Sequence, residues 1–313
     1  MSTASKNKPV AFLFGPTGVG KTVAAAESFD QWAEIVVVDS VQVYRGLDIG
    51  SAKPDAYARQ HPRHHLLDIR TPGEPFDVGE FVTEADRCVD DILARGKLPV
   101  LSGGTAFYFS NFLFGLPATP LAVPQYRLQA QKDWEAWGES RFREALEGVD
   151  PVSASRIQAG DRYRLCRAWE VWLQTGRPLS WYLRPGVPRP GYEVRLLGLD
   201  RPRPELYSRI EARVDAMFEQ GLEEEVRALL RNGYHAQSPG LQGIGYSEFF
   251  PWLVDGEGDR EQVRRSIALH SRRYAKRQLT FFRSLPGVEW HHPDRLGTVA
   301  ADLKRWSLTF HPE

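Results

Sequence analysis

Cysteine is scarce in this chain of 313 residues. Cys88 and Cys166 are the only two, and neither belongs to a Cys-x-x-Cys pair, so the sequence predicts neither a disulfide framework nor a cysteine zinc site. Histidines cluster at 61–65 and 291–292, but no acidic or sulfur ligands accompany them at metal-ligand spacing. We therefore interpret them as loop and strand residues.

A long apolar run is also missing. The N-terminus, MSTASKNKPV, is polar and leads directly into a short apolar stretch. It therefore has the features of neither a secretion signal nor a membrane span. No heptad seam or obvious apolar surface helix is present either. We expect a cytoplasmic, monomeric protein without a membrane partner.

The chain carries no excess charge of either sign, because forty Lys and Arg residues balance forty Asp and Glu residues. The overall charge therefore gives no evidence of a nucleic-acid partner. Any basic surface that binds one must be local.

Short apolar runs alternate with helix-like stretches, which predicts an α/β fold with a parallel sheet covered by helices. A helix is expected over 78–95 and two long helices over 204–230 and 264–283. The expected strands are residues 10–14, 35–38, 65–69, 98–102 and 194–199.

A proline-rich loop at 117–124 interrupts this alternation, and the stretch that follows is helical in pattern and rich in Trp and Arg. A second Pro- and Gly-rich segment, 184–191, ends it. The sequence therefore predicts an inserted helical domain, 118–190, within a core made of 1–117 and 191–313.

The strongest single motif is a complete P-loop between an apolar strand and a helix. It consists of Gly15, Pro16, Thr17, Gly18, Val19, Gly20, Lys21 and Thr22. Backbone amides at the helix N-terminus cradle phosphate oxygens, Lys21 neutralises them, and the Thr22 hydroxyl can bind Mg²⁺. The motif predicts a phosphate ligand without saying which one.

Asp39 follows the apolar run 35–38, at the strand end where ligands bind in open α/β sheets. It could position a metal in an ATPase or kinase, or act as a general base on a substrate held over the P-loop. It could also simply cap the following turn. Spacing alone leaves these interpretations open.

Further motifs follow in a fixed order. They are Asp39-Ser-Val-Gln-Val-Tyr44, Ser51-Ala-Lys53-Pro, His65-Leu-Leu-Asp68 and Gly103-Gly-Thr105-Ala-Phe-Tyr108. With the P-loop, this set closely resembles the tRNA dimethylallyltransferases, and the resemblance continues through 150–157, 164–171, 244–248 and 276–283. Small departures are Ser51 for Thr, Ala106-Phe107 for Gly-Leu, and Ser247 for Lys or Arg, which removes one possible phosphate contact.

The resemblance implies transfer of a dimethylallyl group from dimethylallyl diphosphate to the exocyclic amine of the adenosine adjacent 3′ to the anticodon, with release of diphosphate. Asp39 would accept the amine proton, while Lys21, Thr22 and Mg²⁺ would stabilise the leaving group. Thr105 would hydrogen-bond either the diphosphate or the amine. The base must leave its stack to react.

The same resemblance implies a set of contacts to the tRNA anticodon stem-loop. They are Asp39, Ser40, Val41, Gln42, Thr105, Arg127, Tyr163, Arg164, Leu165, Cys166, Arg167, Gln242, Gly243, Ile244, Gly245, Tyr246 and Ser247. Leu165, Trp169 and Trp172 recur at helical spacing, which favours a core position for their side chains.

Segment 264–283 contains seven Lys or Arg residues and no acidic residue. As a helix it would present a basic stripe to RNA phosphates and pack its other face, although a solvated basic face without a partner is the commoner explanation. The stripe consists of Arg265, Arg272, Lys276 and Arg283, and the opposite one of Ile267, Tyr274 and Phe281.

Three alternatives compete with this function. A P-loop kinase of a small metabolite would use Lys21, Thr22 and Asp39 but would need no helical insert. An enzyme that prenylates free adenine nucleotides would share the core and lack an extended basic surface. A non-catalytic, nucleotide-dependent RNA-binding module would tolerate the loss of Asp39.

Overall fold

The computed structural model describes residues 7–29, 31–182 and 187–310. Contacts divide the chain into a first unit of residues 1–113 and 189–313 and a second unit of residues 114–188. Part of the Pro- and Gly-rich segment 184–191, expected at the domain boundary, lies outside the described residues. Among the described helices, none combines the length and apolar character needed to cross a membrane.

The first unit contains six parallel strands in the order β3-β2-β4-β1-β5-β6. They are β1 (Lys8–Phe14), β2 (Ala33–Val38), β3 (His64–His65), β4 (Leu98–Gly103), β5 (Tyr192–Leu199) and β6 (Glu289–His291). This confirms the predicted α/β class. β6, a short strand at the sheet edge, was not predicted.

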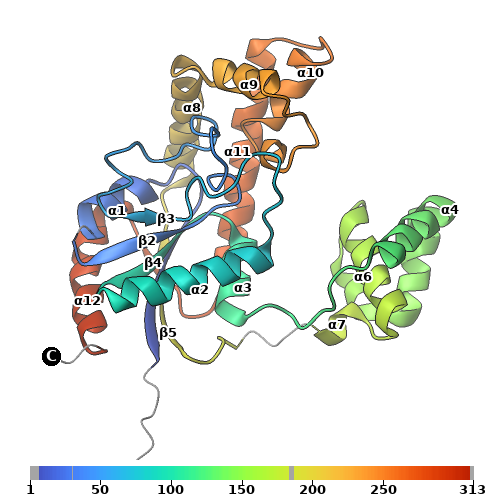
Figure 1. Cartoon of the computed structure of the whole chain (residues 1–313), viewed down its shortest axis with the longest axis horizontal. Helices are drawn as coiled ribbons and strands as arrows, with labels where there is room; N and C mark the ends of the chain where they lie inside the picture. Colours follow the sequence, from blue (N-terminus) through green and yellow to red (C-terminus); the bar gives the residue numbers. More distant parts are fainter. Residues whose placement is uncertain (1–6, 30, 183–186, 311–313) are drawn as a thin grey trace, which may run out of the picture. The chain divides into compact units, whose positions relative to one another are not determined.

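Helices cover both faces of the sheet (Figure 1). α1 (Lys21–Phe29) and α12 (Leu296–Leu308) pack on one face, where they contribute to a core with Leu13 of β1. α2 (Val78–Ala94) and α3 (Ala106–Phe114) lie on the other, where the rings of α3 meet Phe12 of β1. Because both faces are buried, the central strands are apolar at nearly every position.

α2 begins where local side chains satisfy its first amides. The Asp77 carboxylate accepts from the amides of Gly79 and Glu80, and the Glu80 carboxylate accepts from the Asp77 amide. This capping box fixes the helix start at Val78, as the sequence predicts.

Two predicted elements were wrong. The strand expected over 65–69 ends at His65, because Leu66 and Asp68 have positive φ angles of 65° and 57° that no strand accepts. The helix expected over 204–230 is two helices, α8 (Arg203–Glu219) and α9 (Leu222–Arg231). Gly221 separates them with a φ of 97°, in the left-handed region.

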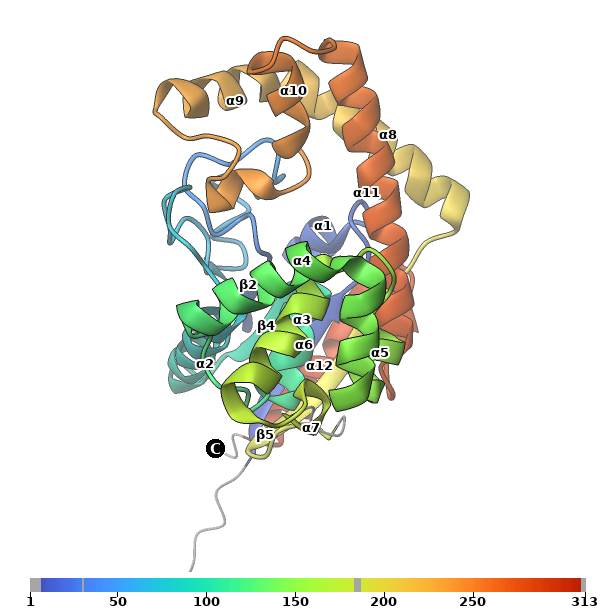
Figure 2. The ribbon, with the colours of Figure 1, turned by 90° about the vertical axis from the view of Figure 1, so that its right-hand side faces the viewer.

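α8 and α11 (Arg260–Arg283) lie side by side and extend beyond the sheet. Figures 1 and 2 show α9 and the short α10 (Phe250–Leu253) at their end farthest from the sheet. The 3-10 helices η1 (Pro239–Gln242) and η2 (Ser247–Phe249) lie between α9 and α10, and η3 (Pro293–Arg295) lies between β6 and α12. A second apolar core, which includes Val214, Phe249 and Ile267, joins this part of the unit.

The second unit is helical, as predicted. It contains α4 (Pro124–Val149), α5 (Pro151–Arg156), α6 (Arg162–Thr175) and α7 (Leu179–Tyr182). Gly138, with a φ of 69°, interrupts α4. Phe142, Leu165 and Trp169 are buried in the core between α4 and α6, with Trp172 packed against it. The core position predicted for Leu165, Trp169 and Trp172 is therefore confirmed.

Candidate active site

The P-loop connects β1 to α1 at the carboxyl edge of the sheet. Gly18 and Gly20 have φ angles of 80° and 106°, which only glycine adopts readily, so the loop can turn its amides inward. The Lys21 ammonium donates to the carbonyls of Gly15 at 2.9 Å and Pro16 at 3.1 Å. Lys21 thus folds back over its own loop, and an anionic ligand would compete with these two carbonyls for its ammonium group.

Asp39 lies directly after β2 and faces the P-loop. Its Oδ1 accepts from the amides of Val41 at 2.8 Å and Gln42 at 3.1 Å, which fixes the carboxylate orientation. Burial raises the pKa of Asp39 above its usual value, although both amides and Lys21 oppose the rise. Since a stronger base accepts protons more readily, this environment suits a general base.

Two residues that the sequence analysis missed complete the P-loop surroundings. The Arg213 guanidinium of α8 donates to the Thr17 hydroxyl at 3.1 Å. Gln278 of α11 accepts from the Thr17 amide at 2.9 Å and donates to the Gly104 carbonyl at 2.8 Å. Burial, and then the charge of Arg213, lowers the pKa of Lys21 to about 7.

A sequence signal for both residues exists in hindsight. Arg213 stands on the apolar stripe of α8, three residues after buried Ile210 and four before buried Met217. Gln278 stands on the stripe of α11 between buried Ala275 and Phe282. A polar residue on an apolar helix face must find a buried partner, and that requirement marks it as unusual.

Two cavities meet at Asp39. The P-loop cavity, of about 480 Å³, is lined by Lys21, Thr22, Gln42 and Arg209 among others. The second cavity, of about 300 Å³, is bounded by α8, α11 and the loop that follows η1. Both are lined by Thr17, Asp39, Ser51, Arg213 and Tyr274.

The second cavity brings together many residues predicted to contact tRNA. They are Asp39, Ser40, Val41, Thr105, Gln242, Gly243 and Ile244. Thr105 lines this cavity and not the P-loop cavity, and its hydroxyl accepts from the Ser40 amide at 3.2 Å. Its position is thus on the side of Asp39 away from Lys21. The remaining apolar lining includes Val214, Met217 and Ile267.

The motif residues Lys53 and Asp68 build the walls and line neither cavity. The Lys53 ammonium, only 1% exposed, donates to Asp48 at 2.8 Å and Asp68 at 2.6 Å. It also donates to the Tyr44 carbonyl, and Gln42 donates from its amide to the Ser51 carbonyl. These contacts join the Asp39–Pro54 block to the His65–Asp68 segment.

Three predicted tRNA contacts, at 245–247, lie behind this wall. Tyr246 is fully buried, and its hydroxyl donates to Glu225 at 2.7 Å. Gly245 donates from its amide to Glu248 at 2.9 Å, and the Ser247 hydroxyl also points to Glu248. The Tyr246 side chain is therefore inaccessible to a nucleic acid, because its ring belongs to the second apolar core.

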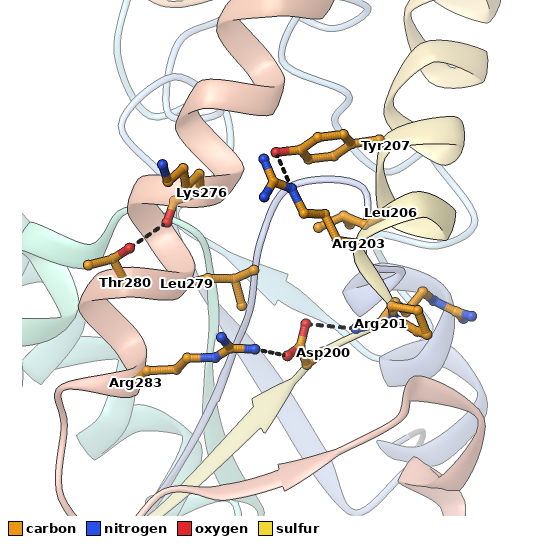
Figure 3. A pocket seen from close by; sticks show the side chains of 10 residues that line it. Asp200, Arg201, Arg203, Leu206, Tyr207, Lys276, Leu279, Thr280 and Arg283 are labelled. Carbon is orange, nitrogen blue, oxygen red and sulfur yellow. Dashed lines mark hydrogen bonds and ion pairs between the residues drawn. The ribbon is translucent and has the colours of Figure 1, made fainter.

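The basic stripe of α11 is more neutral than the sequence suggests. Arg272 pairs with Glu211 of α8, Arg265 approaches Glu261, and Arg283 pairs with Asp200 at 2.6 Å. Figure 3 shows Arg283 turned toward Asp200, with Lys276 farther along α11 in the same groove. In the part of the chain that the structure describes, Lys276 is the one stripe residue without an acidic partner.

Cations without ion pairs gather on the neighbouring side of α11. Arg273, Lys276 and Arg277 line one shallow cavity with Phe281, and no ion pair forms at any of them within the described ranges. Arg277 also lines the second cavity. Lys276 belongs to the predicted stripe, whereas Arg273 and Arg277 each lie one residue beyond a stripe residue, and Arg277 brings this positive charge to the lining of the second cavity.

In the helical insert, four predicted contacts line one cavity of about 460 Å³: Arg127, Tyr163, Cys166 and Arg167. Arg167 also pairs with Glu170 at 2.5 Å, and Arg164 pairs with Asp161 at 3.0 Å. Leu165 is fully buried, so its side chain cannot reach a ligand. Tyr163 is 71% exposed and offers a ring for stacking.

No described group of three or more His, Cys, Asp or Glu side chains could hold a metal ion. His65 instead bonds to Glu34 at 2.7 Å, beside Arg95 and Lys97, and these contacts lower the pKa of Glu34 to about 2 despite its burial. Both cysteines are free and half-buried. Within the described residues, neither histidine cluster belongs to such a group.

Comparison with known proteins agrees with this geometry. The IPP transferase family model matches residues 42–285. The chain is 40% identical to the tRNA dimethylallyltransferase of Borrelia hermsii, over 92% of this chain and 96% of that protein. It is 43% identical to the enzyme of the same name from Stenotrophomonas maltophilia, over 91% and 93% of the two chains.

Solved structures agree as well. The tRNA isopentenylpyrophosphate transferase of Bacillus halodurans superposes with a TM-score of 0.69 at 32% identity, over 98% of this chain and all of that one. A eukaryotic dimethylallyltransferase acting on tRNA superposes with a TM-score of 0.74 at 25% identity, over 96% and 75%. On the family match and on identities near 40% across most of its length, the chain belongs to the IPP transferase family.

Proposed function

We propose that this protein transfers a dimethylallyl group from dimethylallyl diphosphate to the exocyclic amine of the adenosine that follows the anticodon in tRNA. One observation carries the proposal. A cationic P-loop cavity and a more apolar second cavity meet at the buried carboxylate of Asp39. The relatives named tRNA dimethylallyltransferase support the same reaction.

The P-loop cavity suits the diphosphate of the donor. Its amides and Lys21 would bind the phosphate oxygens, and the buried guanidinium of Arg213 adds a second cation beside Thr17. Charge develops on those oxygens as the carbon–oxygen bond breaks. Fixed donors that already face this position stabilise the charge without reorganising.

The residues present fit one Mg²⁺ ion. The exposed Thr22 hydroxyl lines the P-loop cavity and would bind it together with diphosphate oxygens, since Mg²⁺ commonly takes few protein ligands beside a substrate phosphate. When bound, the ion would neutralise part of the charge on the leaving diphosphate.

The second cavity suits the acceptor base. Val214, Met217 and Ile267 give it apolar surface for a flat ring, and Asp39 lies where it meets the P-loop cavity. As the amine nitrogen bonds to the allylic carbon, its proton passes to the Asp39 carboxylate and diphosphate leaves with the bonding electron pair. Thr105 lies on this side and would orient the amine.

The anticodon arm would contact both units. Arg273, Lys276 and Arg277 on α11 would bind backbone phosphates near the mouth of the second cavity. In the insert, Arg127, Tyr163 and Arg167 would bind RNA by charge and stacking.

The test incubates the protein with Mg²⁺, labelled dimethylallyl diphosphate and either unmodified tRNA or AMP, and compares wild type with Asp39→Asn. We expect label on tRNA alone and a loss of about 10²- to 10⁴-fold in kcat for the variant. Asp91→Asn provides a matched control, because Asp91 is exposed on α2, lines neither cavity, and forms no side-chain hydrogen bond or ion pair among the described residues.

The other outcomes separate the alternatives. Label mainly on AMP would replace this proposal with prenylation of free adenine nucleotides. Label on neither acceptor would refute prenyl transfer and favour the kinase or the RNA-binding module. Undiminished transfer by the Asp39 variant would refute the role of that carboxylate as the base.

A further inference from the structure

In the turn Asp48–Ser51, the first three backbone amides donate to one carboxylate. Glu225 Oε2 accepts from the amides of Asp48 at 3.0 Å and Ile49 at 2.8 Å, and Oε1 accepts from that of Gly50 at 3.2 Å. A carboxylate with two or three amide donors is held in a single orientation. α9 is thereby tied to a turn that lies far from it in the sequence.

Tyr246 extends this arrangement to a second loop. Its hydroxyl donates to Glu225 Oε1 at 2.7 Å and accepts from the Ser51 amide at 3.2 Å. Burial, and then the charge of Glu225, raises the pKa of Tyr246, so the hydroxyl keeps its proton. Four consecutive amides, 48–51, are thus satisfied by Glu225 and Tyr246 together.

The two loops are also in direct backbone contact. A Cβ on Gly50 would lie 2.6 Å from the Tyr246 ring, and one on Gly245 would lie 2.9 Å from the Gly50 carbonyl oxygen. Gly245, with a φ of 98°, also favours glycine for its backbone conformation. Because of these close contacts, neither loop can move toward the other. The loops could still move apart, and their hydrogen bonds to Glu225 oppose that separation.

These two loops form adjacent walls of the second cavity. Gly50 and Ser51 line it from one loop, and Gln242, Gly243 and Ile244 from the other. The second loop has one further anchor, since the Gly245 amide donates to Glu248, which bonds to His270 of α11 at 2.7 Å. Glu225 is the residue whose side chain holds both walls.

We infer that Glu225 is a positioning residue for the acceptor base. Through the 48–51 amides and the Tyr246 hydroxyl, it keeps the second cavity at the width that admits an adenine ring beside Asp39. This inference rests on the proposed function for the identity of the acceptor. It assigns no contact between Glu225 and either substrate.

The neighbouring residue provides a matched control. Glu224 occupies the same turn of α9, is exposed, and makes no side-chain hydrogen bond or ion pair within the described ranges. Glu225→Gln keeps the shape of the side chain but directs an amide group at hydrogen-bond donors. Glu224→Gln makes the same chemical change where no amide is bound.

The first measurement is amide hydrogen exchange of the segment that contains 48–51. We expect protection in wild type and Glu224→Gln, and exchange at least tenfold faster in Glu225→Gln. This readout needs no substrate, so it tests the positioning even if the protein modifies no tRNA. Equal exchange in all three proteins would overturn the inference.

The second measurement compares steady-state kinetics for the same proteins and for Tyr246→Phe. For Glu225→Gln we expect a KM for tRNA at least tenfold higher than that of wild type and a KM for dimethylallyl diphosphate within about twofold of wild type. For Tyr246→Phe we expect a smaller increase in the KM for tRNA. In the double variant, KM for tRNA should rise by less than the product of the two single-variant factors, because both substitutions act through the same hydrogen bonds.

A purely structural role predicts a different pattern. It would lower the melting temperature and the active fraction, and hence kcat, while KM for tRNA stays unchanged, and that result would refute positioning. Failure of wild type to label tRNA would refute the proposed function instead, and hydrogen exchange would still decide the role of Glu225.

Discussion

The two faces of α11 carry polar residues of very different consequence. On the face toward the P-loop, Gln278 is 2% exposed and bonds both the Thr17 amide and the Gly104 carbonyl. On the outer face, Arg272 and Arg283 pair with acidic residues of or beside α8 in contact with water. The outer face has more charge, and the inner face determines the geometry of the site.

The physical difference is solvent. Removing a buried partner leaves unsatisfied groups that cost about 1–3 kcal/mol each. An exposed ion pair contributes about 0–1 kcal/mol, because water and salt screen it. A count of charged residues therefore overstates the energetic contribution of the outer face. The single side-chain amide of Gln278, on an otherwise apolar stripe, marks the inner face as the one that determines the site geometry.

Among substitutions in α11, the largest expected effect is that of Gln278→Leu. The substitution keeps side-chain volume but leaves the Thr17 amide and the Gly104 carbonyl without this partner, so both Gly-rich turns lose a constraint. Loss of about 3 kcal/mol of transition-state stabilisation lowers kcat/KM for the donor by about 100-fold. Steady-state kinetics beside Arg272→Leu checks this, and equal losses in both variants would contradict the contrast between the faces.

A pH profile tests the P-loop cation Lys21, which lines the same cavity as Gln278 of the inner face. Burial and Arg213 lower the pKa of Lys21 to about 7, so the free enzyme loses this cation as pH rises through that value. We expect kcat/KM for the donor to fall above pH 7, approaching a tenfold loss per pH unit. Lys21→Arg should lack this decline, because arginine stays protonated. Parallel profiles would show that another group titrates.

The unpaired cations next to the outer face should have an intermediate effect. Arg273→Ala and Arg277→Ala each remove a cation without an ion pair among the described residues. We expect KM for tRNA to rise about fivefold and the salt dependence of binding to weaken by about one phosphate contact. Filter binding over a range of salt concentrations measures this, with Arg272→Ala as the paired control. An unchanged salt slope would exclude these residues from the RNA surface.

The smallest effects are expected for the paired cations. Arg272→Ala and Arg283→Ala each break a solvent-exposed ion pair, with Glu211 and Asp200 respectively. Each should lower the free energy of unfolding by less than about 1 kcal/mol. Urea denaturation measures the change. If either variant lost as much free energy of unfolding as Gln278→Leu does in the same assay, the outer pairs would support the fold as strongly as the inner bonds.

The sequence alone predicts the parallel sheet, the P-loop, Asp39 at a strand end and the helical insert, because each depends on a local pattern of a few residues. It fails at His65–Ile69 and at Gly221. In His65–Ile69 the sequence is mostly apolar, but the backbone has positive φ angles that a strand excludes. At Gly221 a single glycine divides what the sequence pattern predicts as one helix. Neither pattern contains the tertiary contacts that decide the backbone conformation.

The tertiary structure decides which side chains surround the P-loop. Thr17 meets Arg213 and Gln278 across 196 and 261 residues of chain, distances that no helical or strand periodicity spans. It likewise turns Lys53 and Asp68 into a wall of the site and pairs Arg272 and Arg283 with acids from distant segments. Local patterns determine the elements and their chemistry, whereas packing determines which charges are buried, paired or available to a ligand.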